Sequence, residues 1–299
     1  MRIRGLVAAT FTPFTSDGEL DLAKVEPFAA KLIRDGAAGA FVCGTTGEST
    51  SLTLDERMTL AQRWVEAASG RLPIIVHVGT PCVKDSAELA RHSQRIGAAA
   101  VCTMGPCFFK PTGVAELIEF CTPIATAAPG LPFLYYHIPS MTGVDLPMSE
   151  FLPAARQIPT FAGIKYTHHD LLDFGRCLDI ADGKLRLFYG RDETLLAGLA
   201  LGTDCAVGST YTFATPLYQG MIDQFAAGNI AAARAAQRRS RDMITIGLRY
   251  GGMPAFKAVM GMIGLDCGPV RTPLRNLTTQ QVSQLRKDLE AMGFLPGCR

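Results

Sequence analysis

Eight short apolar runs, each followed by a turn signal and a stretch with helical spacing, constrain the fold of this chain more than any other feature. In chain order the runs are GLVAAT, GAFVCG, PIIVHV, AAAVCT, PFLYYH, FAGIKY, LRLFYG and CAVGST. Continuous apolar runs are typical of strands covered on both faces, and parallel strands require helical crossovers between them. Eight strand–helix alternations without a Gly/Ser-rich linker predict a closed (β/α)8 TIM barrel rather than a doubly wound sheet.

Strand signals cease after Phe225, and the rest of the chain is predicted to be helical. Three segments have helical spacing: NIAAARAAQRRSRDMITIGLRY, MPAFKAVMGMIGL and TTQQVSQLRKDLEAMG. We therefore predict a barrel over residues 1–225 and a C-terminal helical extension over residues 226–299. The extension should pack on the barrel as part of one structural unit, because its apolar stripes need a surface to cover them.

Composition and charge exclude several classes of protein. The chain has 299 residues, 48% hydrophobic and 19% charged, and a net charge of +2 leaves no basic surplus for nucleic acid. The N-terminal segment has too few apolar residues for a signal peptide, and prolines interrupt the uncharged stretch 121–144, so no membrane span is expected. Nine cysteines without a CxxC pair favour a reducing, cytoplasmic location. His168 and His169 are adjacent and should diverge, so no metal site is predicted.

Lys165 is the first candidate for chemistry. It lies near the end of the run FAGIKY, where its amine should enter the barrel mouth. Burial removes the solvation of an ammonium and favours the neutral amine, which condenses with ketones to form a Schiff base. From Lys165 alone, an amine that reaches from the barrel rim into water is an equally good interpretation.

Two other strand ends carry suitable residues. The turn GTTGES contains Thr45 and Thr46, whose hydroxyl and backbone N–H groups suit a small carboxylate; no lysine follows, as a nucleotide P-loop would require. Tyr136 lies one barrel position before Lys165, where a phenol can shuttle protons, and Tyr135 should point the opposite way. Taken singly, an ordinary turn and a packing tyrosine are the simpler interpretations.

Asp192, Glu193 and Ser209 follow the last two runs. Their acceptors and hydroxyl suit a polyhydroxylated substrate at the same mouth. Asp192 with Arg191 equally suits a surface ion pair.

Three ordered motifs, GTTGE, YHIPSMTG and GIK, resemble the pyruvate-dependent class I aldolase family of dihydrodipicolinate synthase and N-acetylneuraminate lyase. The resemblance covers nearly the whole chain, and LPFLYYHIPSMTGV, IPTFAGIKYTHHDLLDFG and AVGSTY are similar to the N-acetylneuraminate lyase branch. Synthases of this family carry an arginine for their second substrate where this chain has Met141. They also borrow a tyrosine from a neighbouring subunit, whereas PCFFKP offers Phe108 and Phe109. These differences disfavour synthase chemistry.

The resemblance implies an enzyme, a lyase that reversibly cleaves N-acetylneuraminate (sialic acid) to pyruvate and N-acetylmannosamine. Lys165 would form the Schiff base, Tyr136 would act as the acid/base phenol, and Thr45 with Thr46 would hold the pyruvyl carboxylate. No cofactor is implied, because the lysine is itself the electron sink, and the family is commonly homotetrameric. The positions that bind the sugar part match Thr167, Gly190, Asp192, Glu193, Gly208 and Ser209.

Two alternatives remain open from the sequence. Cleavage of a 2-keto-3-deoxy sugar acid, a hydratase-aldolase reaction on an aromatic substrate, or synthase-like chemistry would keep the fold and the Schiff base. Thr212, where related lyases often have asparagine, leaves the sugar specificity open. A non-catalytic ligand-binding barrel would be expected to lose Lys165 or Tyr136, and both are present.

Overall fold

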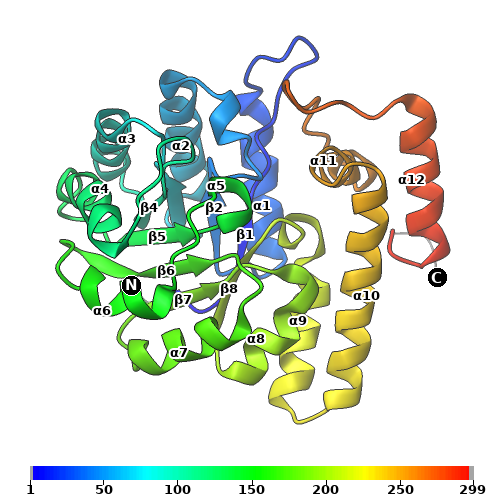
Figure 1. Cartoon of the computed structure of the whole chain (residues 1–299). Coiled ribbons are helices and arrows are strands. Elements are labelled where there is room, and N and C mark those ends of the chain that lie inside the picture. Colours follow the sequence, from blue (N-terminus) through cyan, green and yellow to red (C-terminus); the bar gives the residue numbers. More distant parts are fainter. Residues whose placement is uncertain (1–2, 296–299) are drawn as a thin grey trace.

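Eight parallel strands close into a barrel in the computed structural model, which describes residues 3–295 (Figure 1). The strands pair in chain order, and β8 closes the barrel on β1. Each strand coincides with one of the eight apolar runs, so the predicted TIM barrel is confirmed. The strands are β1 Gly5–Ala9, β2 Gly39–Val42, β3 Ile74–His77, β4 Ala100–Met104, β5 Phe133–His137, β6 Phe161–Tyr166, β7 Arg186–Tyr189 and β8 Cys205–Gly208.

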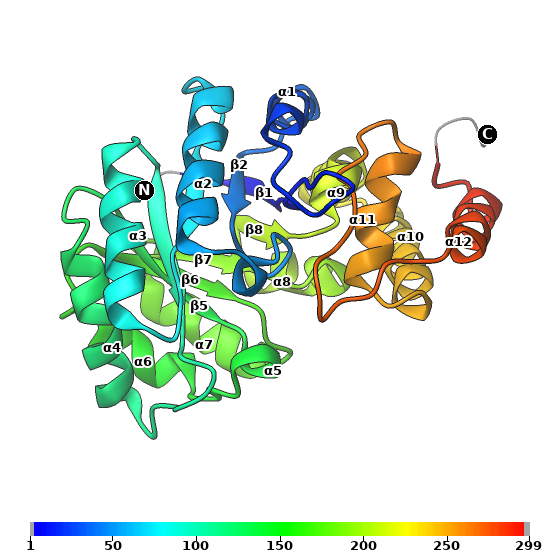
Figure 2. The ribbon, with the colours of Figure 1, turned by 90° about the horizontal axis from the view of Figure 1, so that it is seen from above.

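Helices alternate with the strands and surround the barrel (Figure 2). A capping box between Thr53 and Glu56 begins α2, as the sequence pattern Thr-x-x-Glu indicates. Three short 3-10 helices, Leu22–Lys24, Ser49–Ser51 and Asp192–Thr194, lie in the loops. The α-helices of this part are α1 Val25–Arg34, α2 Leu54–Ala68, α3 Val83–Arg95, α4 Val114–Thr126, α5 Pro139–Thr142, α6 Met148–Ala155, α7 Leu171–Ala181, α8 Leu195–Leu201 and α9 Tyr211–Ala226.

The three predicted C-terminal helices are confirmed as α10 Ile230–Arg249, α11 Met253–Met262 and α12 Thr279–Ala291. They lie together on one side of the barrel, where α10 packs against α9 and both α11 and α12 contact α10 (Figures 1 and 2). A second capping box joins Thr278 and Gln281. Residues 296–299 of the predicted extension lie outside the described residues, and the division at residue 225 stays a prediction. Among the described residues, no helix is long and apolar enough to span a membrane.

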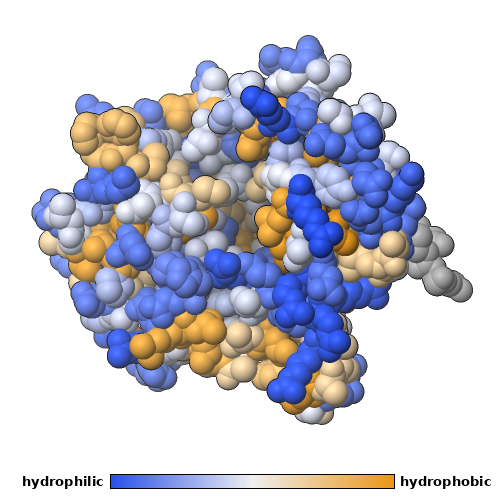
Figure 3. All heavy atoms as spheres, turned by 45° about the vertical axis from the view of Figure 1, so that its right-hand side comes forward, coloured by the Kyte–Doolittle hydropathy of each residue, from blue (hydrophilic) through white to orange (hydrophobic). Residues whose placement is uncertain are grey.

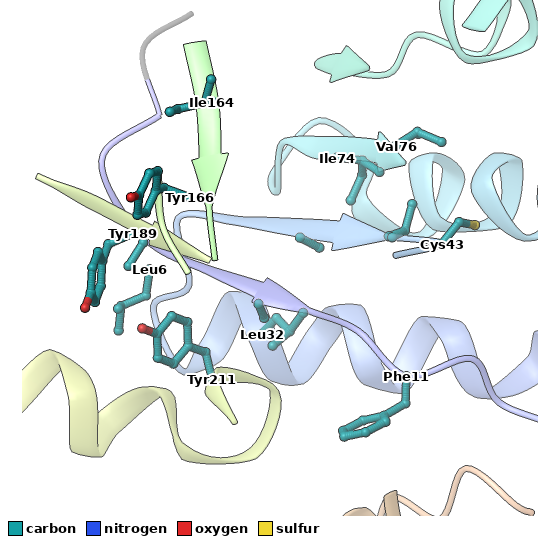
Figure 4. Close-up of a cluster of buried hydrophobic side chains, with 14 of the residues drawn as sticks. Leu6, Phe11, Leu32, Cys43, Ile74, Val76, Ile164, Tyr166, Tyr189 and Tyr211 are labelled. Atoms are coloured by element: carbon teal, nitrogen blue, oxygen red, sulfur yellow. The ribbon is translucent and has the colours of Figure 1, made fainter. Parts of the chain in front are cut away.

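The core has two layers that follow the alternation of side chains along each strand. The outer layer lies between strands and helices and includes Leu6, Ile164 and Leu32 of α1 (Figure 4). The inner layer fills the barrel and includes Val7 and Phe188. The barrel interior is therefore a packed core, and a site has to form at its mouth.

Candidate active site

A pocket of about 380 Å³ lies at the carboxyl ends of the strands. The side of the molecule that carries α10–α12 has mixed hydropathy, with a recess near the centre of the view (Figure 3). The structure brings all ten predicted site residues to the pocket, although their individual roles stay predictions. They are Thr45, Thr46, Tyr136, Lys165, Thr167, Gly190, Asp192, Glu193, Gly208 and Ser209.

Strand register sets Lys165 beside Tyr136. The two residues are direct partners across the β5–β6 pair, so their side chains leave the sheet on the same face. Lys165 is 5% exposed, and its Nζ lies 3.9 Å from the ring centroid of Tyr136 and 4.2 Å from that of Phe41. Tyr135 belongs to the outer layer, as the alternation predicts. The amine is therefore held against two aromatic faces beneath the pocket.

Gly163 lets β6 reach this position. Its φ is +146°, and a Cβ added there would lie 1.9 Å from the carbonyl oxygen of Arg186 on β7. A side chain would push the two strands apart two residues before Lys165. The backbone itself therefore requires glycine at this position of the GIK motif, whether or not a ligand is bound.

The turn after β2 presents backbone donors to the pocket. Within the described residues, Thr45 and Thr46 have amide groups with no hydrogen-bond acceptor, whereas the carbonyl groups of Gly44 and Thr45 accept bonds that close the turn. The hydroxyl of Thr45 lies 3.4 Å from the phenol oxygen of Tyr136, and that of Thr46 lies 2.7 Å from the hydroxyl of Ser209. Free N–H groups beside hydroxyls suit a small carboxylate.

Two non-glycine residues with positive φ bracket this turn: Cys43 at 56° and Glu48 at 54°. Such conformations persist where the surroundings hold them. His77 Nδ1 donates to the carbonyl oxygen of Cys43 at 3.0 Å. On the other side, Glu48 accepts from Nζ of Lys257 and from the amide of Arg271, both at 2.8 Å. The C-terminal extension therefore helps to hold the turn.

Asp192, which follows β7, is buried and lines the pocket. Its Oδ2 accepts from the amide and the hydroxyl of Thr210 at 2.9 and 2.6 Å. Burial raises the pKa of Asp192 to about 6, against the lowering effect of those hydrogen bonds. The expected alternative of an ion pair with Arg191 is wrong, because Arg191 pairs with Glu193 at 2.6 Å.

At two positions of the pocket only glycine fits, because a neighbouring side chain approaches the backbone closely. A Cβ added to Gly208 would lie 2.0 Å from Oδ1 of Asp192, and one added to Gly190 would lie 2.0 Å from the hydroxyl oxygen of Thr167. That hydroxyl is buried and has no partner among the described residues. The hydroxyl of Thr167 is therefore a polar group at the pocket wall whose hydrogen bond a ligand can supply.

Sequence reasoning missed the apolar wall that the C-terminal helices supply. Their apolar stripes indicated only packing, because a contact between segments far apart in the chain leaves no local signal in the sequence. Met141, noted as a departure from the synthases, also lines the pocket and is 65% exposed. The missed wall residues are Ile244, Leu248, Met253 and Phe256.

Two further expectations need correction or restriction. His168 and His169 do not diverge, because their ring centroids lie 4.3 Å apart. Thr212 is 1% exposed and donates to the carbonyl oxygen of Ala9 at 2.9 Å, and it is not among the residues that line the pocket. Any effect of Thr212 on this pocket would therefore be indirect.

Comparison with known proteins finds relatives that match nearly the whole chain. The model of the dihydrodipicolinate synthetase family matches residues 2–292. The N-acetylneuraminate lyase of Gallus gallus is 40% identical over 99% of this chain and 98% of its own length, and that of Mus musculus is 39% identical over 98% and 94%. The structure of the Proteus mirabilis N-acetylneuraminate lyase superposes with a TM-score of 0.96 at 40% identity, covering 99% of this chain and 100% of that one.

The chain therefore belongs to the dihydrodipicolinate synthetase family, as its three motifs predict. The family and the relatives make it a lyase enzyme. This assignment disfavours the alternative of a non-catalytic ligand-binding barrel.

Proposed function

We propose that this protein is a class I aldolase that reversibly cleaves N-acetylneuraminate to pyruvate and N-acetylmannosamine. The observation that carries the proposal is the pairing of Lys165 with Tyr136 at a mouth that also holds free amide donors and a polar wall. Relatives with about 40% identity over nearly the full length are N-acetylneuraminate lyases. Asp192, Glu193 and Ser209 suit the hydroxyl groups of an open-chain sugar acid.

The reaction begins at the amine. The carboxylate of the substrate lies on the amides and hydroxyls of Thr45 and Thr46, which places its C2 carbonyl near Nζ of Lys165. The neutral amine attacks C2, a carbinolamine forms, and loss of water leaves an iminium ion. Tyr136, against whose ring Nζ packs, handles the protons of these steps.

Bond cleavage uses the iminium nitrogen as the electron sink. The C3–C4 bond breaks as the C4 hydroxyl gives up its proton toward Tyr136, which yields the aldehyde N-acetylmannosamine and an enamine on Lys165. Protonation at C3 restores an iminium ion, and water then releases pyruvate and the free amine. Each step is reversible, so the same site runs condensation.

Three finer features belong to the same proposal. The enzyme needs no cofactor, because the lysine supplies the electron sink. It acts in the cytoplasm, which suits eight described cysteines that are all unpaired. It assembles as a homotetramer, the usual state of the family, and exposed Phe108 and Phe109 are large apolar side chains that suit a subunit contact.

Borohydride trapping tests the proposal. The protein is reduced with pyruvate and, in parallel, with N-acetylneuraminate, and the adduct is mapped by mass spectrometry. We expect a pyruvyl adduct on Lys165 from both compounds and N-acetylmannosamine from the second. An adduct from pyruvate alone would redirect the assignment to another keto acid, and no adduct from either would overturn the aldolase mechanism.

A further inference from the structure

The geometry points to a binding site for a divalent transition-metal ion formed by His137, Asp145 and His168, outside the aldolase pocket. Among residues 3–295 this is the only group of three His, Cys, Asp or Glu residues whose ligand atoms all lie within 4.8 Å of one another. Nε2 of His168 lies 3.8 Å from Oδ1 of Asp145, and the rings of His137 and His168 meet edge to face with centroids 5.4 Å apart.

The donor set selects the class of ion. Two imidazoles and one carboxylate suit a first-row transition ion such as Zn²⁺, and three protein ligands leave a fourth position for water. With metal–ligand bonds of about 2.0–2.2 Å, two ligands of a tetrahedral ion lie about 3.4 Å apart. Small rotations of His168 and of the exposed Asp145 would bring the three atoms to that spacing.

The surroundings favour a cation. His137 is 1% exposed, and its Nδ1 has no hydrogen-bond partner among the described residues, which is costly for a buried polar ring. The ring of Tyr166 lies 5.1 Å from that of His137, and its phenol donates to Oδ2 of Asp173 at 3.1 Å, so a second carboxylate lies nearby. Asp145 is exposed and His168 partly exposed, which leaves a path from solvent.

The three ligands come from three segments that border the pocket. His137 ends β5, Asp145 lies between α5 and α6, and His168 follows β6. Pocket residues Met141 and Thr167 lie within or next to these segments. A bound ion would join both ends of the 137–145 segment to the end of β6 and so restrain that wall of the pocket.

The ion would not act on the reacting atoms. Tyr136 and His137 are neighbours on β5, and the alternation of side chains sends them to opposite sides of the strand. Tyr136 belongs to the inner layer, whereas His137 packs against Tyr166 of the outer layer. The site is thus independent of the proposed function and would survive its failure.

Zinc titration of tag-free protein tests the site, with affinity read by calorimetry and the melting temperature read in parallel. The chain offers a matched control in His169, which is exposed and adjacent to His168 but outside the group. We expect one Zn²⁺ per chain in the unsubstituted protein and in His169→Asn. In His168→Asn and in Asp145→Asn, Kd should rise at least about tenfold and the zinc-dependent increase in melting temperature should disappear.

Asp145→Asn keeps the test independent of folding, because the Asp145 side chain is 69% exposed. Co²⁺ spectra address competition from the thiols of Cys82 and Cys107, which are the exposed cysteines among residues 3–295. A spectrum without thiolate charge-transfer bands, lost in Asp145→Asn, would support the site. Equal affinity in all four proteins, a thiolate band at one equivalent, or an equal loss in His169→Asn would overturn it.

Discussion

Lys165 and Lys257 are both almost fully buried, at 5% and 2% exposed, yet the two regions that hold them differ in charge pairing. Lys257 donates to Glu48 at 2.8 Å and lies above the ring of Phe14. Lys165 packs on the rings of Tyr136 and Phe41 and forms no ion pair among the described residues. Burial alone therefore does not make a lysine a nucleophile. Lys257 is tied to an acid partner in a structural ion pair, whereas the amine of Lys165 faces a pocket.

The largest expected effect is at the unpaired lysine. Lys165→Met should abolish cleavage and borohydride adduct formation, because the covalent route is lost. The melting temperature should stay unchanged or rise, since an apolar side chain of similar length replaces an unpaired buried amine. Residual activity equal to that of the unsubstituted protein would contradict the assignment of the nucleophile.

Tyr136→Phe tests the role of the phenol beside Lys165. The ring that packs against Lys165 is kept, but the phenol that lies 3.4 Å from the Thr45 hydroxyl is removed. We expect kcat to fall by about 10²–10⁴-fold, the usual range for loss of a proton-transfer group. The borohydride adduct with pyruvate should still form, only more slowly. Steady-state kinetics and adduct time courses measure the two effects, and an unchanged kcat would remove Tyr136 from the mechanism.

Lys257→Met removes the lysine that has an acid partner. It leaves the carboxylate of Glu48 buried without its partner, which should destabilise the fold by about 3–5 kcal/mol in denaturant unfolding. Because Glu48 also bounds the Thr45–Thr46 turn, we expect weaker pyruvate binding as well. The adduct should nevertheless stay on Lys165. A variant with normal stability would show that the ion pair contributes little.

Asp192→Asn should have the smallest overall effect of the four substitutions, and its effect on stability should depend on pH. The pKa of Asp192 is raised by burial to about 6. The folded state therefore binds the proton more tightly than the unfolded state does, and protonation of Asp192 stabilises the fold. This contribution to stability is complete below pH about 4 and is lost as the pH rises through about 6. The asparagine variant lacks that loss, so its melting temperature should rise relative to that of the parent between pH 4 and pH 7. If the difference in melting temperature between the two proteins stayed constant across this pH range, the raised pKa would be contradicted.

The positions of the strands could be predicted because they depend on local patterns, whereas several of the ten pocket residues, among them Thr167, were implied only by the resemblance to the family. Lys165 and Tyr136 lie at the ends of apolar runs, and a barrel brings all strand ends to one mouth. The wall formed by Ile244 and Phe256 could not be predicted, since its contacts join segments far apart in the chain. The proximity of His137 to His168 was missed for the same reason.

The barrel, the C-terminal helices, the capping boxes and the family can all be inferred from the sequence alone. These follow from periodicities and motifs a few residues long, whose physical causes are side-chain alternation and backbone hydrogen bonding. The pairing of Lys257 with Glu48, and that of Arg191 with Glu193, exists only in the folded chain. By contrast, Lys165 and Asp192 have no opposite charge at hydrogen-bond distance among the described residues. Electrostatic pairing depends on distances of a few ångströms between remote segments, and those distances exist only once the chain has folded.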